Sequence, residues 1–170
     1  LSIVDSHGRK IHRYPGYTCH VCVLRPKSRG NLTLTDANPL TAPQIDPAIL
    51  ADNRDMDVML NGVLKAQQIM EGPAFEKVLA EPLYESGSHD LDILREDIRN
   101  RADTIYHPVG TCKMGQDDMA VVDERLKVHG LEGLRVADAS IMPMVISGNT
   151  NAPSIMIGEK CAAMILEDLA

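Results

Sequence analysis

With 170 residues, the chain is long enough to bury one sizeable hydrophobic core and a small second lobe. Its formal net charge of −7 and the lack of a basic stripe exclude the usual nucleic-acid partner, because phosphates need clustered cations. Apolar residues make up 44% of the chain, yet no apolar run approaches the roughly 18–20 residues that span a bilayer, so no transmembrane segment is expected.

The start of the chain and its cysteines bear on the compartment. The sequence begins with Leu1, as if in mid-strand, and carries no secretory signal, so we expect a piece of a longer protein. Its four cysteines fall at no spacing typical of a disulfide framework, which favours reduced thiols and a cytoplasmic location, with the membrane periphery left open for the full-length protein. The Cys19-x-x-Cys22 pair has no second ligand pair and lies in strand-like sequence, so no metal site is predicted.

The first part of the chain favours extended structure. Residues 16–24 alternate and are rich in β-formers, 25–30 form a basic turn, and 31–35 alternate again, a pattern that predicts a hairpin. Three prolines make residues 36–47 extended, irregular and exposed.

Three helices are expected further along. Asp52 or Asn53 caps the first, which starts near Arg54 and ends at Gly72-Pro73. Ser88 is the expected cap of the second, with Leu91, Leu94 and Ile98 as its buried stripe. Residues 121–123, 126–128 and 134–137 read as short strands. The third helix runs from Pro153 to about Leu169 with Asn151 near its cap, and its apolar faces predict deep burial.

Two polar residues stand out in turn-rich sequence. Among six histidines, His107 is distinguished by its neighbours, because Pro108 favours an extended backbone and Gly110 allows close approach of another group. Asn149 lies about forty residues further on, in Ser-Gly-Asn-Thr-Asn-Ala-Pro at 147–153. Such segments can hold a polar side chain rigidly and leave it reachable by a ligand.

Three segments together resemble, in order and spacing, the C-terminal half of the glucose–methanol–choline (GMC) family of flavin-dependent alcohol oxidoreductases. They are Tyr-His-Pro-Val-Gly-Thr-Cys-Lys-Met-Gly at 106–115, Leu-Arg-Val-Ala-Asp-Ala-Ser at 134–140, and the 147–153 segment. The resemblance is greatest to choline-dehydrogenase-like and alcohol-dehydrogenase-like members. It implies that His107 is the catalytic base and that Asn149 occupies the second catalytic position, which is histidine in some members and asparagine in the choline type.

The resemblance also implies FAD as cofactor and a set of residues beside it. Asp138 and Ala139 match the segment that returns to the flavin domain, although a carboxylate there could instead cap backbone amides. The start of the last helix would face the flavin with its positive end, where charge gathers on reduction. The implied cofactor-side residues are Tyr106, Asp138, Ala139, Asn151, Ala152 and Pro153.

Taken together, the pattern predicts an α+β fold: an antiparallel sheet with helices packed on one face, and a C-terminal strand and helix that complete an FAD-binding domain. Residues 1–130 would belong to the substrate-binding domain and 131–170 to the strand and helix that return to the FAD-binding domain. The dinucleotide-binding GxGxxG motif is absent from the chain.

The implied reaction is oxidation of a primary alcohol, choline-like or other, to an aldehyde, by proton transfer to His107 and hydride transfer to FAD N5. The expected partner is a small-molecule alcohol, and exposed apolar faces favour homo-oligomers. Two alternatives stay open: a non-catalytic fragment or binding module without flavin, and lyase chemistry without net redox change. A chain without GxGxxG is expected to bind FAD weakly and to be inactive alone.

Overall fold

The computed structural model describes residues 3–5, 10–11 and 15–170, which fall into two compact units. One unit comprises Leu1–Val23, Lys27–Gly30 and Pro47–Asp103, and the other comprises Leu24–Pro26, Asn31–Asp46 and Thr104–Ala170. In the described residues the first unit contains the short antiparallel pair β1 (Ile3–Asp5) and β2 (Lys10–Ile11) and two α-helices, whereas the second contains another antiparallel pair and one long helix.

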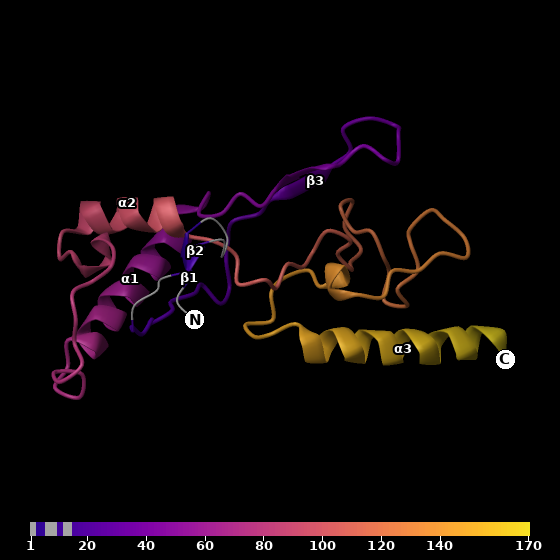
Figure 1. The fold of residues 1–170 in the computed structure, drawn as a ribbon. Helices are drawn as coiled ribbons and strands as arrows, with labels where there is room; N and C mark the ends of the chain where they lie inside the picture. Colours follow the sequence, from indigo (N-terminus) through magenta and orange to yellow (C-terminus); the bar gives the residue numbers. More distant parts are fainter. Residues whose placement is uncertain (1–2, 6–9, 12–14) are drawn as a thin grey trace. The chain divides into compact units, whose positions relative to one another are not determined.

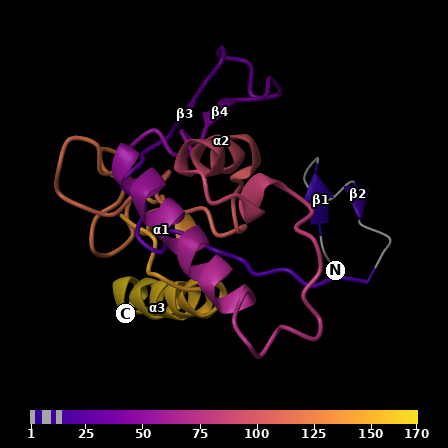
Figure 2. The same cartoon turned by 90° about the vertical axis from the view of Figure 1, so that its left-hand side faces the viewer.

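Helices α1 (Asn53–Met70) and α2 (Leu91–Arg101) lie side by side in the first unit (Figures 1 and 2). The Asp52 side chain caps α1 by accepting from the Arg54 N–H, as expected. For α2 the predicted cap was wrong, because Asp90 and not Ser88 accepts the first helical amides. The buried core between the helices consists of Met56, Leu60, Leu94 and Ile98. Leu91, expected in that stripe, is 49% exposed because it is the first residue of α2.

A buried carboxylate fastens the basic turn to α1. Asp55 is only 3% exposed and accepts three hydrogen bonds: from the Lys27 N–H at 2.8 Å, the Ser28 N–H at 2.8 Å and the Ser28 hydroxyl at 2.6 Å. The Ser28 hydroxyl oxygen also accepts from the Asp52 N–H at 3.0 Å. Burial alone would raise the pKa of Asp55, but the Ser28 and backbone donors outweigh it and lower the pKa.

The hairpin predicted over residues 16–35 was wrong in its first strand. Residues 16–24 form no strand, and β3 (Asn31–Thr33) pairs instead with β4 (Gln44–Asp46), in the register Leu32 to Ile45. Residues 16–24 are held by other means, since the side chain of Val21 lies so close to Gly62 of α1 that a Cβ there would overlap it. The prolines at 39 and 43 fall in the loop between β3 and β4, where no ladder hydrogen bond is needed.

The short strands expected at 121–123, 126–128 and 134–137 are reduced to three isolated bridges, Met114–Val122, Val122–Val128 and Lys127–Arg135. Positive φ angles at Leu126 (65°), Gly130 (76°) and Gly133 (73°) turn the backbone every few residues, so no ladder extends. In its described residues the fold therefore combines helices with antiparallel strands, as the α+β prediction expected, but the strands form two separate pairs and not one sheet.

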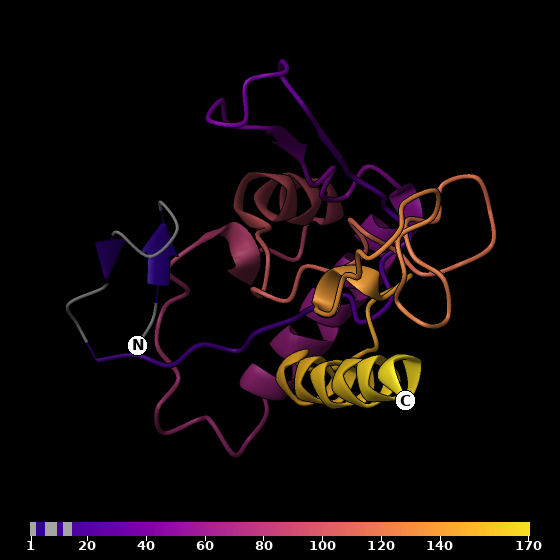
Figure 3. The ribbon, with the colours of Figure 1, turned by 90° about the vertical axis from the view of Figure 1, so that its right-hand side faces the viewer.

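The last helix, α3 (Asn151–Leu169), packs on the core of the second unit together with the short 3-10 helix η3 (Ala139–Ile141), which Figure 3 shows beside it. That core contains Val122, Leu126, Ile141, Met142, Ile157 and Cys161. The prediction of deep burial was wrong for this chain, because Ile155, Met156 and Leu166 are 60%, 53% and 68% exposed. Within the part of the chain that the structure describes, no helix is long and apolar enough to cross a membrane.

Candidate active site

His107 and Asn149, 42 residues apart in the sequence, are in direct contact. The Asn149 Nδ2 lies 2.8 Å from His107 Nε2, and Thr150 Oγ1 lies 2.9 Å from the other ring nitrogen, Nδ1. His107 is half-buried, Asn149 is exposed and Thr150 is buried. The imidazole therefore has a buried partner on one side and an exposed partner on the other, so Nε2 is the ring nitrogen that a ligand could reach.

The segment after His107 is held against the start of η3. The amides of Gly110 and Cys112 both donate to the Ser140 carbonyl, at 3.1 and 3.0 Å, and the Met114 amide donates to the Ile141 carbonyl at 2.8 Å. Gly110 has a φ of +95°, a conformation that side chains rarely adopt. A Cβ at Gly110 would also lie 3.4 Å from the Met142 carbonyl oxygen. This glycine allows the backbone to turn between His107 and the bonded segment.

Backbone strain is found on both sides of the pair. Tyr106, directly before His107, has a φ of +67°, and Ser147, two residues before Asn149, has a φ of +66°. Non-glycine residues in this region each cost about 1–3 kcal/mol and gather at functional sites. Arg25 Nε donates to the Ser147 hydroxyl at 2.8 Å, and the Tyr106 amide donates to Thr104 Oγ1 at 3.0 Å. These bonds stabilise the two strained turns.

Apart from Tyr106, which lies in the loop before His107, the residues expected beside a cofactor lie at the starts of two helices in the second unit. Asp138 caps η3, its carboxylate accepting from the Ser140 amide at 2.7 Å, which is the capping role that sequence reasoning left open for it. Asn151, Ala152 and Pro153 form the first turn of α3, whose N-cap is Thr150. Pro153 is thus the third helical residue, still within the turn where a missing N–H breaks no helical bond.

Sequence reasoning missed Thr150 and Arg25 as members of this region. Thr150 directly follows Asn149, and its hydroxyl is an expected helix-capping group, so nothing in the sequence pointed it toward His107. Arg25 lies in the basic turn, which reads as a solvated connection. Only the fold brings Arg25 and Ser147, 122 residues apart, into contact.

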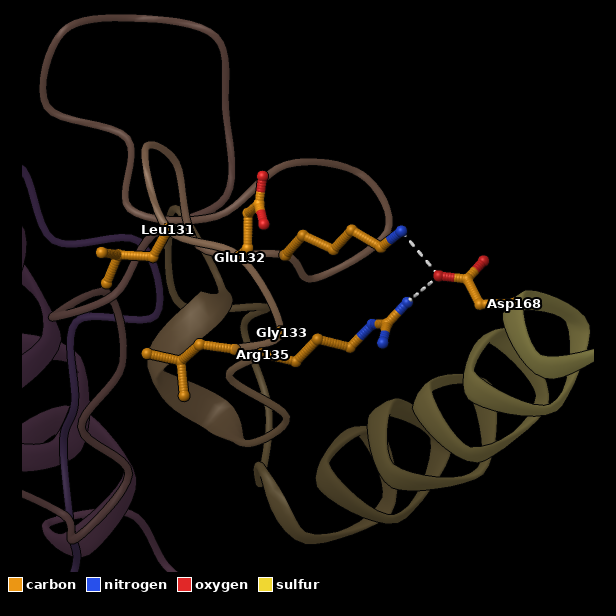
Figure 4. Close-up of a pocket in the computed structure, with 7 residues that line it drawn as sticks. Leu131, Glu132, Gly133, Arg135 and Asp168 are labelled. Carbon is orange, nitrogen blue, oxygen red and sulfur yellow. Dashed lines mark hydrogen bonds and ion pairs between the residues drawn. The ribbon is translucent and has the colours of Figure 1, made fainter.

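An open cavity of about 350 Å³ lies elsewhere in the second unit, lined by Lys127, Leu131, Glu132, Gly133, Leu134, Arg135 and Asp168 (Figure 4). Asp168 accepts from Lys127 and Arg135, both at 2.6 Å, and from Arg125 at 2.8 Å. Bonds from Lys127 and Arg135 hold the pKa of Asp168 well below its ordinary value. The charges of Lys127, Arg135 and Asp168 in this cavity are therefore paired with one another.

Neither a disulfide nor a metal cluster joins the cysteines. All four are free, with Cys19 and Cys22 exposed, Cys112 half-buried and Cys161 buried. Among residues 3–5, 10–11 and 15–170, no group of three or more His, Cys, Asp or Glu side chains could hold a metal ion.

The sequence model of the GMC oxidoreductase family matches residues 26–158, which include both residues of this pair. The chain therefore belongs to the GMC oxidoreductase family. Its sequence is 48% identical over 164 residues to alcohol dehydrogenase [acceptor] of Pseudomonas putida, covering 96% of this chain and 30% of that protein. It is 45% identical over 160 residues to oxygen-dependent choline dehydrogenase of Cronobacter sakazakii, covering 94% of this chain and 29% of that protein.

Solved structures agree with this assignment. A single-residue variant of formate oxidase from Aspergillus oryzae superimposes with a TM-score of 0.78 and 32% identity, covering 86% of this chain and 26% of that one. An FAD-dependent oxidoreductase from Chaetomium thermophilum also gives a TM-score of 0.78, with 29% identity, covering 85% and 26%. The chain thus spans less than a third of the length of the relatives it matches.

Proposed function

We propose that this chain is the C-terminal part of an FAD-dependent enzyme that oxidises a primary alcohol, choline-like or other, to an aldehyde. The observation that carries the proposal is the 2.8 Å contact between His107 and Asn149 at a partly exposed edge of the second unit. Family membership supports the class of reaction, and the names of two relatives, an alcohol dehydrogenase and a choline dehydrogenase, support the substrate class.

In the proposed reaction His107 takes the hydroxyl proton of the alcohol at Nε2. An alcohol ionises far above neutral pH, so a base must accept this proton as the C–H bond breaks, and histidine is the side chain best matched to that task near neutrality. Nε2 is the ring nitrogen that contacts Asn149, while Nδ1 contacts buried Thr150. An alcohol oxygen bound at Asn149 would therefore lie within reach of this base.

Asn149 would donate an N–H bond to the substrate oxygen as negative charge develops there. A fixed donor aimed at such an oxygen typically contributes about 10²–10³-fold in rate. In the structure its amide nitrogen contacts His107 instead, and both groups can exchange this bond for bonds to the alcohol. Proton acceptor and charge stabiliser would then converge on one oxygen atom.

The residues present fit a flavin on the side of α3. The helix begins at Asn151, two residues after Asn149, and its N-cap Thr150 makes no side-chain capping bond, so the Asn151 and Ala152 N–H groups and the positive helix end would be available to an anionic ring. Asn151, Ala152 and Pro153 would hold that side, with Tyr106, Asp138 and Ala139 as further contacts. Bound FAD supplies the two-electron acceptor for the substrate hydride.

The two parts of the chain would belong to different domains of the complete enzyme. Residues 1–130 would contribute to the substrate side and residues 131–170 to the FAD-binding domain, in which a GxGxxG motif from outside this sequence holds the dinucleotide. The chain alone would then bind FAD weakly. Stoichiometric flavin absorbance in the purified 170-residue chain would contradict this point.

The test is His107→Ala in the complete enzyme, with His129→Ala as a matched control. His129 is an exposed histidine of the same unit whose ring contacts the Gly115 carbonyl, at 3.1 Å. We expect flavin reduction by the alcohol to slow by at least about 10²-fold in the first variant and to stay unchanged in the control. Near-normal reduction in His107→Ala would refute the proposed function.

A further inference from the structure

The second ring nitrogen of His107 is held by a residue that no other part of the proposed reaction uses. Thr150 Oγ1 lies 2.9 Å from His107 Nδ1, and Thr150 is only 9% exposed. Asn149 contacts the same ring at Nε2, at 2.8 Å. The consecutive residues Asn149 and Thr150 therefore contact the two ring nitrogens of His107, the exposed Asn149 at Nε2 and the buried Thr150 at Nδ1.

The Thr150 hydroxyl contacts His107 and does not cap the helix that follows it. Thr150 is the N-cap of α3, a position where a threonine oxygen ordinarily accepts from a helical amide, but its side chain makes no capping bond. Its main chain is nevertheless fixed, since the Thr150 carbonyl accepts from the Ser154 amide at 3.0 Å and from the Ser154 hydroxyl at 2.6 Å. The backbone thus holds Thr150 rigidly while its hydroxyl faces His107.

The distances favour one tautomer of the imidazole. A neutral ring carries a single N–H, so Nε2 can act as a base only when the proton is on Nδ1. With the proton on Nδ1, that N–H donates to Thr150 Oγ1 at 2.9 Å and Nε2 accepts from Asn149 Nδ2 at 2.8 Å. In the opposite tautomer Nδ1 would accept from the Thr150 hydroxyl, at the same 2.9 Å, and from the Thr150 amide at 3.4 Å. Nε2–H would then face the Asn149 amide nitrogen, itself a donor, at 2.8 Å. The Asn149 contact therefore selects the Nδ1–H form, in which the Thr150 hydroxyl oxygen accepts the bond from the ring N–H.

We propose that Thr150 is a positioning residue that keeps the proton of neutral His107 on Nδ1 and so leaves Nε2 free to accept the substrate proton. This inference rests on the proposed function for its catalytic consequence. Once Nε2 takes that proton, the Nδ1–H bond to Thr150 becomes a bond from a charged donor, which is stronger than its neutral counterpart. Thr150 would therefore stabilise the ring more after proton transfer than before it.

The experiment compares Thr150→Val, which keeps the shape and removes the hydroxyl, with Thr150→Ser, which keeps the hydroxyl, in the complete enzyme. The first readout is the tautomer of His107, measured from the ¹⁵N shifts of its ring nitrogens and assigned by their loss in His107→Gln. We expect the Nδ1–H form in the wild type and in Thr150→Ser, and a shift toward the Nε2–H form in Thr150→Val.

The second readout is steady-state oxidation of an alcohol with an artificial electron acceptor. Thr150→Val is expected to lower kcat by about 10–100-fold, taking as a guide the range seen when a metal-binding histidine loses the group that orients its second nitrogen, with KM nearly unchanged. Thr150→Ser should stay within about threefold of the wild type, the residual cost of its freer side-chain rotation. Since the hydroxyl makes no capping bond, the melting temperature of Thr150→Val should change little. If the valine variant does not fold, Thr150→Ala replaces it in the same comparison.

The outcomes separate this inference from the proposed function. An Nε2–H tautomer in the wild type, or unchanged tautomer and kcat in Thr150→Val, overturns the role of Thr150 whatever the fate of His107→Ala. Normal flavin reduction in His107→Ala overturns the proposed function, while the ¹⁵N shifts still decide whether Thr150 sets the tautomer. Loss of kcat in both Thr150→Val and Thr150→Ser also contradicts the inference, because it would show that the hydroxyl is not the group that matters.

Discussion

The Asp55 cluster and the His107 cluster each join segments far apart in the sequence through short hydrogen bonds, yet they differ in what they leave available. Asp55 is 3% exposed, and its two oxygens are already engaged by three donors of the same unit. His107 is half-buried, and its outer nitrogen contacts the exposed side chain of Asn149. The first cluster stabilises the fold, whereas the second has bonds that it can exchange with a ligand.

The effect of removing a polar side chain from a fold depends on where its hydrogen-bond partners come from. A buried polar side chain whose partners are all supplied by the protein fixes backbone segments, and removing it leaves several buried donors unpaired. A partly exposed pair that is bonded mainly to itself costs little to separate, because water or substrate can replace either partner. The two clusters should therefore respond oppositely in stability and in activity.

The largest expected effect is the loss of turnover when the Asn149 side chain is removed from the His107 cluster. Asn149→Ala in the complete enzyme should lower turnover of an alcohol by about 10²–10³-fold, because the donor to the substrate oxygen is lost. The melting temperature should change little, since Asn149 is exposed. The matched control is Asn100→Ala on α2, where an exposed asparagine donates to Glu96 at 3.2 Å. Equal turnover in the two variants would remove Asn149 from the reaction.

The converse change is Asp55→Ala, which should destabilise the protein without changing turnover per folded molecule. Three donors lose a charged acceptor, a loss expected to cost about 2–3 kcal/mol of the free energy of unfolding. Urea denaturation measures this cost. Asp57→Ala on the same helix is the control, because Asp57 is exposed and pairs with Arg95 at 3.2 Å, an ion pair worth at most about 1 kcal/mol. A midpoint for Asp55→Ala no lower than that of Asp57→Ala would show that the cluster contributes no stability.

Acid should weaken the Asp55 cluster in a defined direction. Donors from Ser28 and the backbone, acting against burial, lower the pKa of Asp55 below its ordinary value of 3.8. The charged form is therefore favoured in the folded state, so its stabilisation is fully present above about pH 4 and is lost as the pH falls through the lowered folded pKa. Urea midpoints measured between about pH 2 and pH 6 should fall with acid less steeply in Asp55→Asn than in the wild type.

Asp52 must be separated from Asp55 in that measurement. Its bonds with Arg54 lower the pKa of Asp52 to about 2, so it titrates in the same acid range and with the same sign. The Asp52–Arg54 pair is exposed and is screened by salt, whereas the buried bonds of Asp55 are not. The difference between wild type and Asp55→Asn should persist in about 1 M NaCl. Its disappearance there would assign the acid sensitivity to the exposed pair.

Sequence signals predicted the helices, and the segments that bring His107 and Asn149 together, better than they predicted the strands. Of the two caps predicted for α1, Asp52 and Asn53, the structure shows Asp52, and α3 ends at Leu169 as expected. The resemblance of short segments led to His107 and Asn149, which the fold brings together, while their catalytic roles stay predictions. Local pattern suffices where a few neighbouring residues decide the conformation.

The features that the sequence did not predict depend on contacts between residues far apart in the chain. Residues 16–24 alternate like a strand but pack through Val21 on Gly62, and the partner of β3 lies in the proline-rich segment instead. Burial of α3 was overestimated because apolar composition does not tell which other segment covers a face. The role of Thr150 was missed because a capping residue and a histidine-binding residue look alike in sequence.

The smallest expected effect concerns the glycines that flank the pair. Gly110→Ala should cost about 1–2 kcal/mol of the free energy of unfolding, because its φ of +95° disfavours any side chain. Its Cβ would lie 3.4 Å from the Met142 carbonyl oxygen, which is close to ordinary contact, so the strain comes from the positive φ. Relief of that strain would shift the segment after His107, and turnover should fall with stability. Gly148→Ala is the control, since no atom lies within 4 Å of a Cβ built there and its φ is not positive. Denaturation midpoints that rank Gly148→Ala as the more harmful change would mean that strain at Gly110 does not help to place His107.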